Sequence, residues 1–208
     1  KGLKFGIHLM RGIPKPAVKQ DLPIKGTSSH ASDIVDPDTE TPWYGGMAGV
    51  DMDKPGAQEY YNSLIELYAS WGVDFIKIDG IAVNPFREKE IIAYYQAIEN
   101  TGRDIVISLS PGPSDLNKAN VYKEYSNMWR IQNDYWDKWS NVEKNFELCA
   151  NWNHHRSPGN WPDADILMLG KLAISSEALW VYDAKPRMTR LTTDEQYTLM
   201  SLWSIFRS

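Results

Sequence analysis

The sequence predicts an α/β fold built on a parallel sheet, because strand-like and helix-like segments alternate about five times along the chain. No GxGxxG pattern follows any predicted strand and no Walker loop is present, which disfavours the nucleotide-binding versions of this fold. Polar residues follow several different strands, an arrangement that is typical of the (β/α)8 barrel.

Short apolar runs bounded by turn residues are typical of strands, and longer segments with apolar residues at 3–4 spacing are typical of helices. The predicted strands cover residues 3–9, 73–79, 104–110, 128–132 and 164–170. The predicted helices cover residues 54–72, 85–102, 114–125, 136–152 and 192–208. In the last helix, a capping box can form between Thr192 or Thr193 and Glu195 or Gln196.

A long segment, residues 11–53, separates the first predicted strand from the first predicted helix. Pro, Gly, Ser, Thr and Asp are frequent there, so we expect an irregular excursion, which in a compact domain is usually functional or disordered. A closed barrel normally needs about 250 residues, and the predicted strands are too few to close one in a chain of 208 residues. Either the sheet is open, or the chain is part of a longer protein.

The composition limits the kinds of partner. A net charge of −5 without clusters of Lys and Arg disfavours nucleic acid and anionic membranes. No apolar run approaches the roughly 20 residues that span a bilayer. No signal peptide or lipidation motif is visible, but the first residues already resemble a strand, so we expect residues before Lys1.

Cysteine and aromatic usage add two further observations. Cys149 is the single cysteine, so no internal disulfide can form, and no Cys/His zinc spacing exists. The chain holds nine Trp and eleven Tyr, whose faces suit the apolar faces of sugar rings, although core packing explains most of them.

Two charged residues stand at alternate positions near the end of the apolar stretch WGVDFIKIDG, residues 71–80. Alternate side chains of a strand point to the same side, so Lys77 and Asp79 are expected to lie side by side. Other polar residues at predicted strand ends are His8, Ser108, Ser110, Arg130, Asp134, Asp163 and Asp165. Taken alone, Lys77 and Asp79 fit a plain ion pair as well as a functional pair in a barrel mouth.

The most distinctive blocks of the sequence are KGLKFGIHLMRGIP, WGVDFIKIDG, MWRIQNDYWDKW, NWPDADILMLG and RMTRLTTDEQYTLMSLWSIFRS. Together, and in this order, they resemble glycoside hydrolase family 27, the clan D α-galactosidases and α-N-acetylgalactosaminidases. The resemblance implies that residues 1–208 form part of one catalytic (β/α)8 TIM barrel, about strands three to seven with their helices. Strands one, two and eight and a C-terminal β-sandwich domain are then expected outside this chain.

The resemblance also implies a retaining glycoside hydrolase that acts by double displacement with two aspartates. Asp79 matches the family's nucleophile, and Lys77 is expected to favour its ionised form and to hydrogen-bond sugar hydroxyls. Asp134 matches the residue that acts first as acid and then as base. In a retaining enzyme the two carboxyl groups lie roughly 5–6 Å apart.

Asp134 is also open to a structural interpretation. We expect its pKa to be raised by the charge of Asp79 and by partial burial among aromatic neighbours. These neighbours are Trp129, Tyr135 and Trp136. Alternatively, Asp134 is the N-cap of the following helix, with Asn133 competing as the cap and Asp137 placed to interact with the helix dipole.

The resemblance places further residues near the substrate. Arg130 aligns with an arginine that binds ring hydroxyls, but a salt bridge to Asp163 or Asp165 is equally consistent with its position. Asp165 is expected to hold that arginine or a loop in place. His8 stands where the family often has a tyrosine that touches substrate. Ser110 lies in the loop that distinguishes a 2-hydroxyl from a 2-acetamido group in the family.

The expected activity is the release of terminal α-linked galactose from oligosaccharides or glycoconjugates. Ser110 and Gly112 are small, which keeps an α-N-acetylgalactosaminidase as an alternative. A β-L-arabinopyranosidase is another alternative, because the region on which that activity depends lies before residue 1. A non-catalytic carbohydrate-binding barrel fragment is an alternative of a different class.

No cofactor and no metal are expected, and the expected partner is a carbohydrate, with neither nucleic acid nor membrane. A divalent metal could be imagined on Asp79, Asp134, Asp163 and Asp165, but Lys77 would repel the ion. By resemblance to bacterial relatives, we expect a secreted or periplasmic protein.

Two loops are expected near the barrel mouth. Trp43 and Tyr44 in the excursion fit either a wall on which a sugar stacks or packing on the barrel rim. Residues 180–192 carry Asp183 and Arg187.

Overall fold

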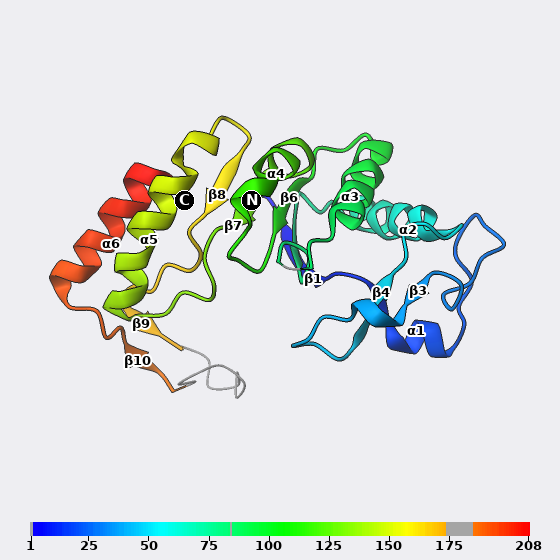
Figure 1. Cartoon of the computed structure of the whole chain (residues 1–208), viewed down its shortest axis with the longest axis horizontal. Helices are drawn as coiled ribbons and strands as arrows, with labels where there is room; N and C mark the ends of the chain where they lie inside the picture. Colours follow the sequence, from blue (N-terminus) through cyan, green and yellow to red (C-terminus); the bar gives the residue numbers. More distant parts are fainter. Residues whose placement is uncertain (1, 84, 174–184) are drawn as a thin grey trace.

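The computed structural model describes residues 2–83, 85–173 and 185–208. Within these residues the centre of the molecule is a five-stranded parallel sheet with the order β1-β5-β6-β7-β8 (Figure 1). Its strands are β1 (Gly6–Met10), β5 (Phe75–Asp79), β6 (Val106–Leu109), β7 (Met128–Arg130) and β8 (Trp161–Asp163). The predicted parallel sheet is therefore confirmed.

Helices follow the strands along the chain, as the alternating pattern predicts. They are α2 (Ala57–Ser70), α3 (Glu88–Thr101), α4 (Ala119–Tyr125), α5 (Trp139–Trp152) and α6 (Thr193–Phe206). Short 3₁₀ turns precede α4 and follow α5, at Leu116–Lys118 and Asn153–His155. In the described part of the chain, no helix is long and apolar enough to cross a membrane.

The strand order identifies the sheet as a barrel segment. The order of strands in a doubly wound sheet reverses at a switch point, whereas here each strand pairs with the next one along the chain. The sheet is also strongly curved. Lys77 Nζ on β5 lies 3.9 Å from Asp163 Oδ2 on β8, although two strands stand between them and a flat sheet would separate β5 from β8 by roughly 14 Å.

The alternation within β5 explains how a charged pair fits into a buried strand. Ile76 and Ile78 are fully buried in the core. The side chains that alternate with them, Phe75, Lys77 and Asp79, point to the opposite side and are partly exposed. Burying each isoleucine stabilises the fold by about 1.5–3 kcal/mol, so the strand register is fixed and the two charged groups are directed into the concave side.

Local signals set the helix ends. Gly102 ends α3 in the left-handed conformation, with φ of +64°. Thr192 and Glu195 form the predicted capping box at the start of α6. The apolar residues of α5 are only partly buried: Val142 and Cys149 lie in the core, whereas Trp139 and Phe146 are exposed.

The excursion over residues 11–53 is more regular than predicted. It contains α1 (Lys15–Lys19), a 3₁₀ turn (Pro37–Thr39) and an antiparallel sheet with the order β2-β4-β3. These strands are β2 (Ile13–Pro14), β4 (Met47–Val50) and β3 (Val35–Asp36). Strands of two to four residues give too short a pattern to recognise, and their core consists of scattered residues: Ile13, Ile24, Ile34, Ala48 and Val50.

The predicted strand over residues 164–170 is wrong. The observed strand is β8, Trp161–Asp163, which contains a proline and an aspartate that disfavour a central strand. Pro162 is tolerated because the N–H that bonds toward β7 belongs to its neighbour Trp161, which donates to Asn127 O at 2.8 Å. The apolar run after it is only partly buried, with Ile166 45% and Leu167 42% exposed. It leads into β9 (Lys171–Leu172), which pairs with β10 (Arg187–Met188).

Candidate active site

Asp79 ends β5 at the mouth of the curved sheet, with its side chain 20% exposed. Its Oδ1 accepts hydrogen bonds from Ser110 Oγ at 2.9 Å and from the backbone N–H of Gly80 at 2.9 Å. Its Oδ2 lies 3.8 Å from His8 Nε2. One carboxylate oxygen is therefore held in a fixed orientation, and the second is directed toward His8 on the neighbouring strand.

Three adjacent strands supply these groups. His8 lies in β1 opposite Lys77, and its side chain is 57% exposed. Ser110 directly follows β6 and is 2% exposed. The structure thus brings His8, Asp79 and Ser110 together, as expected for side chains at neighbouring ends of parallel strands.

Lys77 has a different carboxylate partner from the one expected. Its ammonium group pairs with Asp163 on β8 at 3.9 Å, instead of with Asp79 two residues along its own strand. The curvature of the sheet explains this pairing, because it carries β8 toward β5 on the concave side. Lys77 remains 31% exposed, so its ammonium group also faces the mouth.

Arg130, at the end of β7, is 7% exposed at its side chain and is held on several sides. Its Nε donates to Gln132 O at 2.9 Å, and its Nη2 donates to Asp134 Oδ1 at 2.8 Å. Its Nη1 lies 3.4 Å from Asp165 Oδ1. The salt bridge to Asp165 is confirmed, and contact with ring hydroxyls stays a prediction.

Asp134 differs from expectation in its surroundings. Its side chain is 66% exposed, whereas Trp129 and Tyr135 are buried in the core, so the expected partial burial among aromatic rings is wrong. The helix N-cap interpretation is also wrong, because α5 begins at Trp139 with Lys138 as its N-cap. Asp134 instead lies in the loop after β7, at the same end of the sheet as Asp79, with β6 between the two strands that carry them.

Asp165 holds the loop after β7 in place. Its side chain is 1% exposed, its Oδ2 accepts the backbone N–H of Tyr135 at 2.7 Å, and its own N–H donates to Asp163 Oδ1 at 2.9 Å. Burial raises the pKa of Asp165, and the nearby Arg130 opposes that shift. Asp165 therefore holds both Arg130 and the segment that carries Asp134, as expected.

The segment after β6 is tightly packed. The peptide bonds Ser110–Pro111 and Gly112–Pro113 are both cis. A Cβ at Gly112 would lie 2.1 Å from Gln132 O and 2.6 Å from Arg130 O, so only glycine fits beside the loop that follows β7. Gly112, one of the two small residues seen in the sequence, is thus required for packing.

A second buried carboxylate has contacts that the sequence did not predict. Asp137, expected near the helix dipole, has a fully buried side chain that accepts from Arg187 Nη2 at 2.8 Å and from the backbone N–H of Arg190 at 2.7 Å. These bonds join the start of α5 to the β10 strand. The guanidinium of Arg187 is the main cause that lowers the pKa of Asp137 to about 2, and the Arg190 N–H adds to it.

Replacing Asp137 by asparagine is expected to lower the free energy of unfolding by about 2 kcal/mol at pH 7. The pKa is lowered in the folded state, so this contribution is present above about pH 4 and is lost as the pH falls through about 2. Urea unfolding at several pH values measures it. A difference between the two proteins that stays constant down to pH 2 would contradict this account.

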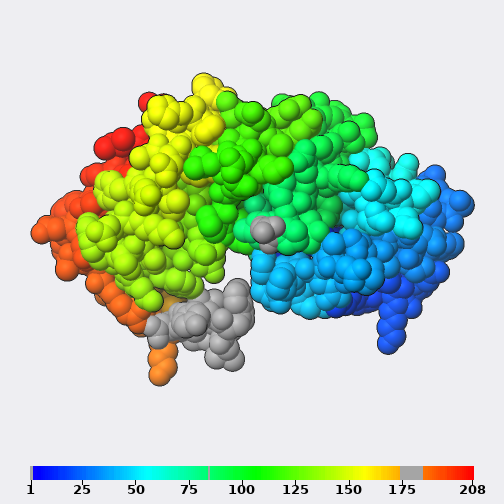
Figure 2. Space-filling model, viewed as in Figure 1, coloured from blue at the N-terminus to red at the C-terminus, as the bar shows by residue number. Residues whose placement is uncertain are grey.

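A cleft of about 680 Å³ opens beside Asp79. His8 and Asp79 line it at the strand ends, and Trp43 and Tyr44 line it from the excursion. Figure 2 shows the molecule hollowed at its lower centre, beside the blue segment of the excursion. Among the described residues, no group of three or more His, Cys, Asp and Glu side chains is arranged to hold a metal ion.

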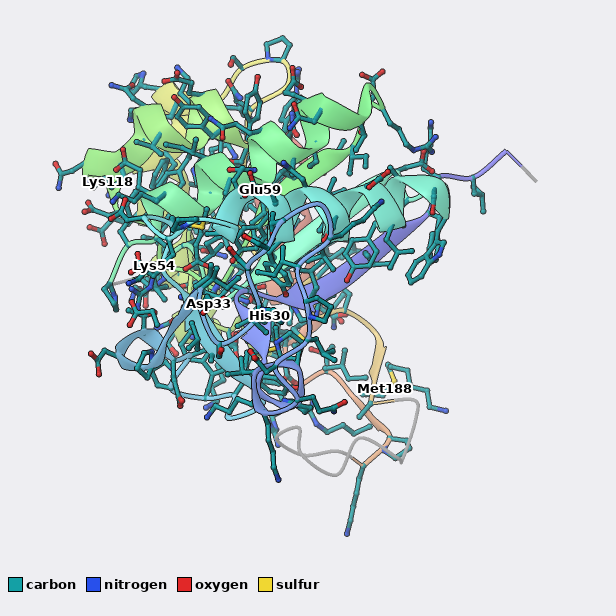
Figure 3. The ribbon with its side chains drawn as sticks, turned by 90° about the vertical axis from the view of Figure 1, so that its right-hand side faces the viewer. His30, Asp33, Lys54, Glu59, Lys118 and Met188 are labelled. Carbon is teal, nitrogen blue, oxygen red and sulfur yellow. The ribbon has the colours of Figure 1, made fainter. Side chains whose placement is uncertain are left out.

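Other titratable residues lie away from this cleft. His30 is on the outer face of the excursion, 4.0 Å from Asp33, as seen from the side in Figure 3. Asp183, expected in a loop near the barrel mouth, lies outside the described residues. One buried ion pair close to Asp79, between Arg11 and Glu90, was not predicted, because the two residues stand 79 positions apart in the sequence.

A family model described as alpha galactosidase A, of the Melibiase_2 type, matches residues 44–189. The chain belongs to glycoside hydrolase family 27, the melibiase family. The chain is 29% identical over 163 residues to human α-galactosidase A, covering 73% of this chain and 34% of that protein. It is 29% identical over 173 residues to chicken α-N-acetylgalactosaminidase, covering 72% and 39%. The chain thus spans little more than a third of these family members.

Solved structures in the family are more similar. A β-L-arabinopyranosidase from Geobacillus stearothermophilus is 50% identical with a TM-score of 0.93, covering 100% of this chain and 48% of that one. A variant of that enzyme was solved in complex with arabinose. A protein from Bacillus halodurans, described as a putative α-N-acetylgalactosaminidase, is 43% identical with a TM-score of 0.81 and the same coverage. The predicted family and the partial TIM barrel are confirmed.

Proposed function

We propose that the protein is a retaining glycoside hydrolase that releases terminal β-L-arabinopyranose, with Asp79 as the nucleophile and Asp134 as the acid and base. The observation that carries the sugar preference is 50% identity over the whole chain to a β-L-arabinopyranosidase, against 29% over part of it to α-galactosidase A. The predicted release of α-galactose becomes the second candidate.

The geometry supports the role proposed for each aspartate. Asp79 has one oxygen fixed by Ser110 and Gly80, so the other can attack the anomeric carbon without losing its orientation. Asp134 is exposed at the same end of the sheet, where a glycosidic oxygen can reach it, and it can pass a proton to the leaving group. In the second step Asp134 would take the proton from the water that releases the sugar from Asp79.

The two candidate sugars differ at a single group. β-L-Arabinopyranose has the ring configuration of α-D-galactopyranose but lacks its hydroxymethyl group. The residues around Asp79 would therefore meet the same ring hydroxyls in either sugar. The preference between the two sugars depends on whether the site has room for the hydroxymethyl group. If the barrel is longer than this chain, residues outside the chain also limit that room.

The test compares hydrolysis of 4-nitrophenyl β-L-arabinopyranoside and 4-nitrophenyl α-D-galactopyranoside by the full-length protein. We expect kcat/KM to be higher for the arabinopyranoside by about 10-fold to 200-fold, the range that one small group gives in a fitted pocket. Both substrates have the same leaving group, so the ratio reports on the sugar site alone. A ratio that favours the galactoside would overturn the proposed preference and leave the glycosidase assignment in place.

An N-acetylgalactosaminide belongs in the same comparison. The 43% identity to the B. halodurans protein and the small residues Ser110 and Gly112 favour it as a third candidate. Turnover of 4-nitrophenyl N-acetyl-α-D-galactosaminide above that of the arabinopyranoside would select this alternative. Binding of all three sugars without turnover would select the non-catalytic carbohydrate-binding alternative.

We also propose that this chain is completed by further strands in the full protein. The matched structures are about twice as long, since the chain covers 48% of each. In the described residues, β1 and β8 form the two edges of a strongly curved sheet, and a barrel would pair both of them.

A further inference from the structure

We propose that Trp43 and Tyr44 form the subsite for the leaving group, accepting an aryl or sugar ring through its apolar face. This inference rests on the proposed glycosidase function but not on which sugar is released. The two residues come from the excursion, outside the strand ends that supply Asp79 and Asp134.

The first observation is where these aromatic side chains lie. Trp43 is 52% and Tyr44 is 47% exposed, whereas Trp129 and Trp152 are almost fully buried in the core. Single exposed apolar residues are common and prove nothing by themselves. Here two adjacent aromatic residues line the same cleft as His8 and the proposed nucleophile Asp79.

The second observation limits how far the backbone of this segment can lie from the end of β5. A Cβ at Gly80, the residue after Asp79, would lie 2.8 Å from Thr41 Oγ1, so Thr41 packs directly against the end of β5. Trp43 is two residues further along, which limits its Cα to about 7 Å from that of Thr41. The backbone that carries the aromatic pair is therefore held close to the end of β5.

The third observation is that the segment is anchored at several points. The Arg11 guanidinium, itself 2% exposed, donates to Thr39 O. The backbone N–H of Tyr44 donates to Thr41 O at 3.1 Å, and Gly46 O accepts the N–H of Lys15 at 3.0 Å. An aromatic surface that is already fixed loses little conformational freedom when a ring stacks on it.

The direction of the excursion decides which part of the substrate it meets. The sugar that reacts must sit at Asp79, at the end of β5. Figure 1 shows the excursion, with β3 and β4, lying beyond the ends of the central strands on the side of β1. A ring that reaches Trp43 and Tyr44 from Asp79 is then the next ring outward, which is the leaving group.

The experiment compares two substrates of the preferred sugar that differ only in leaving group. One is the 4-nitrophenyl glycoside, whose ring can stack, and the other is the glycosyl fluoride, whose leaving group is a single atom. For Trp43→Ala we expect kcat/KM to fall about tenfold for the nitrophenyl glycoside and to stay within about twofold for the fluoride. Trp43→Phe keeps a ring and should recover most of the loss.

Trp71→Ala is the matched control, because Trp71 is a 62% exposed tryptophan at the far end of α2, away from the strand ends. It should leave both substrates unaffected. Equal losses on both substrates for Trp43→Ala, or no loss on either, would overturn the subsite. Turnover of the fluoride by the unaltered protein establishes the glycosidase function separately, so failure of the subsite and failure of the function give different results.

Discussion

Replacing Asp79 by asparagine is expected to reduce hydrolysis of the preferred 4-nitrophenyl glycoside by roughly 10⁴-fold or more. A carboxamide cannot form the glycosyl–enzyme intermediate on which a retaining mechanism depends. Its oxygen can still accept the hydrogen bonds from Ser110 Oγ and the Gly80 N–H, so the loop geometry should survive. The loss should therefore appear in kcat, with the fold and sugar binding intact.

Two measurements separate this prediction from a loss of folding. Calorimetry should show that Asp79→Asn still binds the free sugar, and azide or formate should partly restore turnover by acting as an external nucleophile. Asp33→Asn is the control, because Asp33 is an exposed aspartate on the outer face of the excursion and pairs with His30 (Figure 3). Unchanged activity in Asp79→Asn would exclude Asp79 as the nucleophile.

The parallel sheet could be predicted because its signals are local. Each long helix carries an apolar stripe, and the strand around Lys77 combines buried isoleucines with a clear end at Gly80. The excursion and β8 could not be predicted, since strands of two to four residues are too short to show a periodicity of their own. Their position depends on neighbours: Pro162 is a strand residue only because Trp129 on β7 lies opposite it.

The candidate site also combines features that follow from the sequence with features that do not. That Asp79 and Asp134 lie at one end of the sheet follows from their places after parallel strands, and the sequence contains that information. Side-chain pairing does not follow from it. Lys77 pairs with Asp163 because the sheet curves, and Asp134 pairs with Arg130 while its side chain stays 66% exposed. Curvature and side-chain direction are properties of the assembled fold.

The ion pair between Arg11 and Glu90 could not be predicted from the sequence either, and its loss is expected to lower the free energy of unfolding strongly. Arg11 follows β1, is 2% exposed, and its backbone N–H donates to Asp79 O at 2.9 Å. Its guanidinium donates to Glu90 Oε1 through Nε at 2.9 Å and through Nη2 at 2.6 Å. Glu90, 4% exposed in the first turn of α3, also accepts from Tyr61 Oη at 2.7 Å.

This network joins the excursion, α2 and α3 around the strand end that carries Asp79. Each nitrogen of the Arg11 guanidinium has a protein acceptor: Glu90 for Nε and Nη2, and the Thr39 carbonyl for Nη1. A buried pair with satisfied hydrogen bonds contributes little net stability over apolar replacements, but loss of one partner leaves an uncompensated buried charge. Neutralising one residue of the pair is therefore the substitution that tests this ion pair.

Glu90→Gln is expected to lower the free energy of unfolding by about 3–5 kcal/mol, because Arg11 then stays charged in a buried site without a carboxylate. Urea unfolding measures the change. Glu66→Gln is the matched control, since Glu66 pairs with Lys25 on the surface, where both side chains are mostly exposed, and should have no measurable effect. Arg11→Met alone should destabilise the protein similarly, and Arg11→Met with Glu90→Leu should do so by much less than the sum of the single changes. Additive losses would show that the two residues act independently, and would remove the ion pair as the anchor of the excursion beside Asp79.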